Sequence, residues 1–142
     1  MNRVVSRLVY FPTLLLVTLL TLSCGGGTMD PPRMLTAISV TPTVAQAPNG
    51  QTQVQFVATG TFTEPPITVS PLAVSWNFAN TPLTACSANN CAQITSKGVA
   101  MCGNLATGAW TITASAPADP KAALNNFGVS RVSANATLKC QQ

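Results

Sequence analysis

The clearest β-strand pattern in the chain is the stretch Gln51-Thr-Gln-Val-Gln-Phe-Val-Ala-Thr-Gly-Thr-Phe62. Side chains of an extended chain alternate between two faces. On one face this stretch places Val54, Phe56 and Ala58. On the other it places Gln53, Gln55 and Thr59. The turn motif Pro48-Asn49-Gly50 precedes the stretch and Glu64-Pro65-Pro66 ends it, so we expect a half-buried strand between two turns.

The same period of two recurs along the chain beyond residue 34, and no ten-residue stretch after the N-terminal segment shows helical periodicity. Alternating runs occur at 38–41, 74–78, 110–115 and 132–138. Turn signals about every ten residues between short strands are typical of a β-sandwich. A chain of 142 residues has room for one such domain. We therefore expect an all-β domain over residues 35–142.

The order of these runs resembles the second group of bacterial immunoglobulin-like domains, the family found in adhesins such as invasin and intimin. The resemblance is carried by Leu35–Pro42, Asn49–Thr52, Val54–Phe62, Val74–Trp76, Ile94–Ala100, Ala106–Gly108, Trp110–Ala114 and Ser133–Leu138. It implies an immunoglobulin-like β-sandwich of about seven strands with Greek-key connections. Members of the family are mostly rigid spacers, and some are adhesive.

Two features depart from that family. The segment Ala122–Arg131 is longer than usual before the last strand, and it is interpreted either as a binding loop or, preferably, as a longer turn. The chain also carries more cysteines than most members do.

Residues 1–23 are typical of a secretory signal peptide. Arg3 and Arg7 form a positive region, and the apolar stretch Leu8–Leu22 follows and ends in small residues. This stretch is shorter than the ~20 residues needed to cross a bilayer and contains Pro12, so a retained transmembrane anchor is the weaker interpretation. We expect the protein to be exported.

The run Leu20–Gly27 resembles a bacterial lipoprotein lipobox, in which the cysteine, here Cys24, is acylated after the signal is removed. The position three before the cysteine departs from the family, because it is Thr21 and not Leu, Val or Ile. Ordinary signal cleavage, which would free the protein, therefore stays open. By the same resemblance, Gly25 after the cysteine favours the outer membrane or cell surface. Residues 24–34, with three glycines and a proline pair, are expected to form a flexible linker.

Four further cysteines, Cys86, Cys91, Cys102 and Cys140, lie in the expected domain. An even number in a small exported domain indicates two disulfides, for which three pairings exist. Pairing Cys86 with Cys91 across a turn-forming tetrapeptide, and Cys102 with Cys140, is favoured. Four thiolates could instead hold zinc, but they lack the paired short spacings of zinc sites. A redox pair is disfavoured further, because there is no Cys-x-x-Cys.

The residue types argue against an enzyme, and no cofactor or metal is expected. The chain has no histidine, which removes the commonest general base and the usual catalytic zinc ligand. Its three carboxylates, Asp30, Glu64 and Asp119, lie in separate linker and turn segments, so neither a glycosidase pair nor a calcium loop is evident. The net charge of +4 includes the two signal arginines, and no basic run suits nucleic acid.

Trp76 and Trp110 are the remaining candidates for ligand contact, because exposed aromatic rings stack on sugars. Both alternate in phase with apolar neighbours, so a core position is favoured for each, less strongly for Trp110.

The favoured function is a non-catalytic structural or spacer module of the cell envelope, anchored in the membrane by lipid at Cys24. The alternative is an adhesive module that binds a surface polysaccharide or an envelope protein through loops of the sandwich. An exposed Trp110, or an ordered apolar patch around Leu124 and Phe127, would favour binding. A uniformly polar Thr/Ser/Asn surface would favour the structural role. A third, weaker interpretation is docking to an envelope assembly through an exposed edge strand.

Overall fold

The computed structural model of the protein describes residues 31–48, 52–79 and 90–141. Within these ranges the chain forms only strands and turns, which confirms the all-β prediction. None of the described residues belongs to a helix that is long and apolar enough to cross a membrane. The chain divides into the units Met1–Pro31 and Pro32–Gln142, and the second is the β domain described here. The predicted signal peptide and Cys24 lie outside the described residues.

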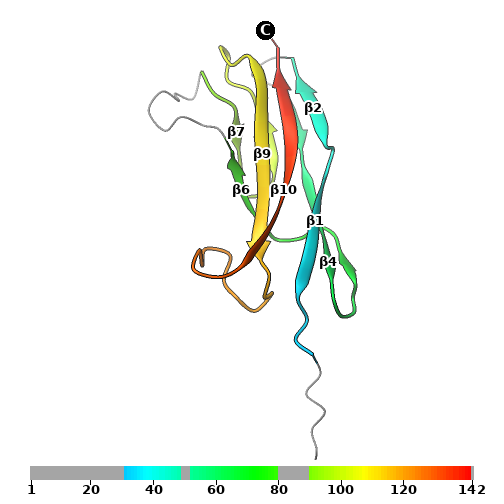
Figure 1. Ribbon diagram of the computed structural model, residues 1–142. Coiled ribbons are helices and arrows are strands. Elements are labelled where there is room, and N and C mark those ends of the chain that lie inside the picture. Colours follow the sequence, from blue (N-terminus) through cyan, green and yellow to red (C-terminus); the bar gives the residue numbers. More distant parts are fainter. Residues whose placement is uncertain (1–30, 49–51, 80–89, 142) are drawn as a thin grey trace, which may run out of the picture. The chain divides into compact units, whose positions relative to one another are not determined.

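A four-stranded sheet is built on the two longest strands, β9 (Gly108–Pro117) and β10 (Arg131–Cys140) (Figure 1). They pair antiparallel without interruption from Arg131 opposite Pro117 to Cys140 opposite Gly108. Antiparallel β6 (Ser75–Phe78) flanks β9, and β2 (Val44–Ala47) flanks β10 in parallel. The order in this sheet is β2-β10-β9-β6.

Two three-stranded sheets contain the other strands. In the first, β4 (Val57–Phe62) lies between β1 (Leu35–Thr41) and β5 (Thr68–Val69). In the second, β8 (Val99–Met101) lies between β3 (Gln53–Gln55) and β7 (Gln93–Ile94). Buried side chains from all three sheets form one hydrophobic core, an arrangement consistent with a β-sandwich.

The stretch expected as one strand over 51–62 is divided between two sheets at Phe56. Gln53–Gln55 pairs with β8, and Val57–Phe62 pairs with β1. At the break, the Phe56 amide donates to the carbonyl of Gly98 at 2.9 Å, and the Phe56 side chain is fully buried. The alternation of faces survives the break, because Phe56, Ala58 and Phe62 all point into the core.

A second division, between β1 and β2, follows Thr41, where the sequence indicates only the end of a strand. β1 belongs to a three-stranded sheet and β2 to the four-stranded one. The described ranges contain ten strand segments, compared with the expected seven or so, and the break at Phe56 and the separate β2 account for two of the additional ones. The Greek-key order stays a prediction.

Small side chains dominate the interior. Among the described residues, Phe56, Ile112 and Leu138 are the large side chains with the least exposure. Eight of the other buried positions in the described ranges are alanines: Ala47, Ala58, Ala92, Ala100, Ala106, Ala114, Ala116 and Ala136. Burying each of the large side chains stabilises the fold by about 1.5–3 kcal/mol. Because alanine side chains are small, they fill the core only if the backbones of facing strands lie close together.

The turn between β7 and β8 depends on Gly98. Gly98 has a φ of 78°, a left-handed conformation that L side chains rarely adopt. A Cβ at this position would lie 2.5 Å from the carbonyl oxygen of Phe56 and 3.1 Å from the indole ring of Trp76. The turn is therefore tightly packed against both the Phe56 break and the Trp76 ring.

We expect Gly98→Ala to destabilise the domain by roughly 3 kcal/mol, because it adds a clash with backbone to the ~1–2 kcal/mol cost of a left-handed alanine. Gly108→Ala is the matched control. Gly108 also has a positive φ, of 88°, but a Cβ added there would meet nothing within 4 Å. Gly108→Ala should therefore cost only the free energy of placing an alanine in the left-handed conformation, about 1–2 kcal/mol. Urea unfolding of both variants measures the difference, and equal losses would contradict the packing argument.

Candidate functional site

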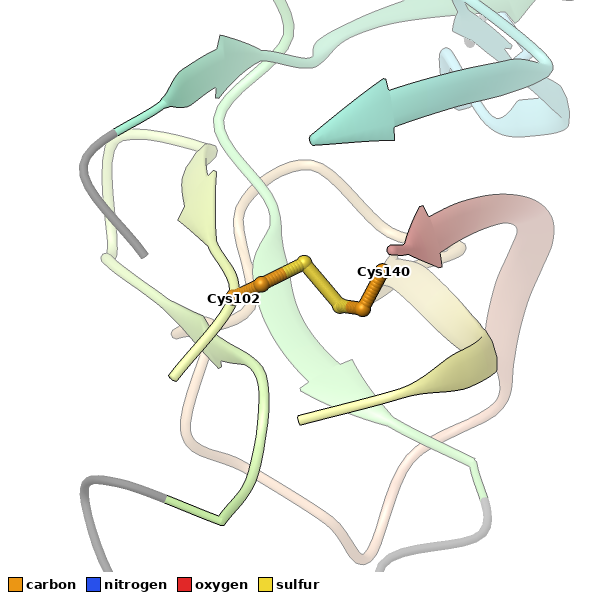
Figure 2. Close-up of a disulfide and its surroundings, with 2 residues drawn as sticks. All are labelled: Cys102 and Cys140. Atoms are coloured by element: carbon orange, nitrogen blue, oxygen red, sulfur yellow. A yellow bond between two sulfur atoms is a disulfide. The ribbon is translucent and has the colours of Figure 1, made fainter. Parts of the chain in front are cut away.

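The predicted disulfide between Cys102 and Cys140 is present, with the two Cα atoms 5.7 Å apart (Figure 2). Cys102 follows β8 and Cys140 ends β10, so the bridge joins the four-stranded sheet to the sheet that contains β8. Both cysteines are buried. Cys91 is also disulfide-bonded. Its expected partner, Cys86, lies outside the described residues.

We expect removal of the Cys102–Cys140 bridge, by alanine at both positions, to cost about 4 kcal/mol, because it frees a loop of 38 residues in the unfolded chain. Alanine at both Cys86 and Cys91 is the comparison, since a loop of about five residues is worth only about 2 kcal/mol by the same reasoning. Thermal unfolding of the two double variants checks the ranking. A larger loss from the short loop would contradict it.

Trp110 lies on the inner face of β9, in phase with the buried Ile112 and Ala114. Its ring contacts the ring of Phe78 edge-on, with centroids 6.0 Å apart. The indole is half-buried, and its Nε1 is buried with no hydrogen-bond partner in the described part of the chain. Trp76 likewise packs against the core. Both positions fit the core interpretation, and sugar stacking at Trp110 stays a prediction.

The segment between β9 and β10, residues 118–130, is a long loop with its own hydrogen bonds. The Asp119 carboxylate accepts a hydrogen bond from the Lys121 amide at 2.9 Å, and the Asn126 side-chain oxygen accepts one from the Gly128 amide at 3.1 Å. Backbone bonds close two further turns, from Ala122 to Asp119 and from Asn126 to Ala123. Such local bonds between Asp or Asn side chains and the backbone fix tight turns.

Arg131 fastens this loop to the four-stranded sheet. Its Nη1 donates to the carbonyls of Leu124 at 2.9 Å and Asn126 at 3.3 Å. Its Nη2 donates to the carbonyl and the hydroxyl of Ser115 at 3.2 and 3.1 Å, and to the hydroxyl of Ser75 at 3.4 Å. One guanidinium thus joins the loop to β9 and β6. Its planar fork of donors suits this role, which a lysine could not reproduce.

The fastened loop exposes apolar side chains. Phe127 is 73% exposed and Leu124 is 37% exposed. The guanidinium of Arg131 lies over the Phe127 ring, 5.2 Å from its centroid, a cation–π distance. Ala122–Arg131, interpreted from sequence preferably as a longer turn, is therefore an ordered loop that presents Phe127 to solvent. This is the feature expected of a binding module.

The outer face of the four-stranded sheet has the opposite character. Its central side chains are uncharged and polar: Ser75, Asn77, Thr111, Thr113, Ser115, Ser133, Asn135 and Thr137. Thr113 and Asn135 are paired across β9 and β10 by a hydrogen bond of 2.9 Å. The polar character is confined to this face, because Phe127 and Leu124 are exposed on the loop, so the described surface is not the uniformly polar one expected of a structural module.

A groove of about 430 Å³ lies beside this sheet. Its lining is mainly apolar and includes Phe56, Leu72, Trp76 and Leu124, with Gln55 and Lys97 at its polar part. The Gln55 amide is occupied, because it donates to the carbonyls of Phe56 and Lys97. Over the described ranges no three His, Cys, Asp or Glu side chains gather in a way that could hold a metal ion.

The chain matches no protein-family model, and no curated protein matches it. The immunoglobulin-like resemblance therefore still depends on the sequence motifs alone. Sequence reasoning singles out Leu124 and Phe127 but misses Arg131, which it names only as the end of the segment Ala122–Arg131. The position of Arg131, directly after a long loop and at the start of an alternating run, is the only signal the sequence offers for it.

We expect Arg131→Gln to release the loop from the sheet, because Gln cannot bridge the Leu124 and Asn126 carbonyls to Ser115. Amide hydrogen exchange across 122–128 should rise roughly tenfold or more, and stability should fall by about 2 kcal/mol. Lys139→Gln is the control, since it removes the same charge from an exposed position on the same strand. Unchanged exchange in Arg131→Gln would show that the loop is ordered without the guanidinium.

Proposed function

We propose that this chain is a non-catalytic module of the cell envelope, held to its membrane by lipid at Cys24. The observation that carries the proposal is the succession of segments in the sequence. A signal-like segment ends at a lipobox-like cysteine, and β1 begins only eleven residues later, at Leu35. Two or three acyl chains on one cysteine give durable anchoring, because each buried CH₂ contributes about 0.8 kcal/mol.

The lack of catalytic groups in the sequence supports a non-catalytic role. There is no histidine in the chain, and of its three carboxylates Glu64 and Asp119 lie in different turns of the domain. Without a histidine, the chain lacks the commonest base that could activate its numerous hydroxyl side chains. An all-β core of small side chains, braced by a disulfide, suits a rigid envelope domain.

A second candidate function is binding through the loop between β9 and β10. It is favoured by the exposure of Phe127 and Leu124 on a loop that Arg131 holds in place. Large apolar side chains that stay exposed on an ordered loop are typical of interaction sites. This binding function is compatible with the proposed lipid anchor, since a domain tethered to a membrane can also bind a partner.

The test of the anchor is the intact mass of the protein extracted from its own membrane, before and after reduction and alkylation. We expect a chain that begins at Cys24 and carries acyl chains, and that lacks four hydrogens before reduction because of two disulfides. Cys24→Ser is the control variant, and it should lose the acyl mass and leave the membrane fraction. A native chain that starts near Cys24 without acyl mass would contradict the anchor and indicate a freely exported domain.

A further inference from the structure

Three segments of the domain meet where the chain enters it. The Leu35 amide donates to the carbonyl of Ala118 at 2.7 Å, and the Ala118 amide donates to the carbonyl of Ser130 at 2.8 Å. The base of the 118–130 loop therefore lies against the start of β1. The turn between β4 and β5 joins them, because the Arg33 guanidinium donates to the carbonyls of Glu64 and Pro66. We call this region the N-terminal end of the domain (Figure 1).

Three of the five large apolar side chains that are exposed in the described ranges lie at this end; the other two are Val44, 52% exposed on β2, and Leu105. Phe127, Leu124 and Ile67 are 73%, 37% and 47% exposed, and all three lie in its loops. Leu105 is similarly exposed, at 63%, but it lies in the connection before Gly108, at the other end of β9. Nine residue steps separate the two ends of β9, which is about 30 Å at the rise of an antiparallel strand.

The distance from Cys24 limits how far the N-terminal end can lie from a membrane. Arg33, already bonded to the domain, is nine residues after Cys24. Nine residues span at most about 30 Å even when fully extended. If Cys24 is acylated, the N-terminal end stays within this reach of the lipid surface. The opposite end, with Leu105, can lie a further strand length away.

Charged groups at the N-terminal end fit a lipid interface but do not dominate it. Arg33, Lys121 and Arg131 are accompanied there by Glu64 and Asp119, which leaves a small positive excess. The guanidinium of Arg131 lies over the exposed Phe127 ring, whereas the Phe62 ring beneath Arg33 is buried in the core. Aromatic rings with adjacent cations suit the boundary between headgroups and acyl chains. The apolar loop, more than the charge, would supply the attraction.

We propose that the loop of residues 122–128 inserts Phe127 into the surface of the membrane to which Cys24 is anchored. The domain is then held at two points, the acylated Cys24 and the loop, and is oriented with the Leu105 end away from the lipid. This inference depends on the proposed lipid anchor. The anchor raises the local concentration of the loop at the bilayer, so a single exposed aromatic side chain is sufficient for contact.

The test compares two added tryptophans, Phe127→Trp and Leu105→Trp, each in the otherwise intact lipidated protein. Both positions are exposed loop sites, and an unfolding midpoint equal to that of the parent confirms that each variant folds. The proteins are placed in vesicles of phosphatidylethanolamine and phosphatidylglycerol that contain brominated phosphatidylcholine. After subtraction of the parent signal from Trp76 and Trp110, we expect the bromines to quench the residue-127 emission at least twofold and the residue-105 emission hardly at all.

Equal quenching at the two positions would overturn the proposal, and so would free access of aqueous iodide to both tryptophans. Free access of iodide would leave a protein partner as the molecule that contacts the loop. The mass of the same samples separates these failures from failure of the anchor. Acyl chains without selective quenching overturn the loop contact alone, whereas missing acyl chains overturn the anchor and the loop contact together.

Discussion

The uninterrupted pairing of β9 with β10 is the constraint on which the rest of the domain depends. Its ladder runs from Arg131 opposite Pro117 to Cys140 opposite Gly108. Because the register of the two strands is fixed along the whole ladder, the inner side chains of both strands face the same core. β6 pairs with the free edge of β9, and β2 pairs with the free edge of β10. The small side chains of that core allow the other sheets to pack closely against the ladder.

The two ends of this ladder are closed by different chemistry. At the Cys140 end, a covalent bridge to Cys102 ties the ladder to the sheet that contains β8. At the Arg131 end, hydrogen bonds from one half-buried guanidinium hold the connecting loop. A covalent bridge cannot open locally, whereas hydrogen bonds near solvent can break and reform at small cost. The domain therefore combines an end closed by a covalent bridge with an end closed by the hydrogen bonds of one side chain.

The sequence predicted the inner and outer faces well and the division of strands poorly. Alternation alone placed Phe56 and Ala58, and likewise Ile112 and Ala114, on the correct side, because burial on a strand has a period of two. The break at Phe56 was not predictable, since the residues on both sides keep the same alternation while they pair with different sheets. The parallel pairing of β2 with β10 joins segments almost a hundred residues apart, and no local pattern encodes such a contact.

The candidate site was predictable only in part, for a related reason. An apolar residue in a stretch such as Asn125-Asn126-Phe127-Gly128 gives the same sequence signal whether it folds inward or points to solvent. The outcome here is decided by backbone carbonyls at Leu124 and Asn126, which turn inward to meet Arg131 and leave Phe127 outside. Backbone acceptors have no sequence signature, because every residue carries one. The exposure of Phe127 is thus a consequence of an anchored backbone and differs from the chance exposure of a side chain on a loose loop.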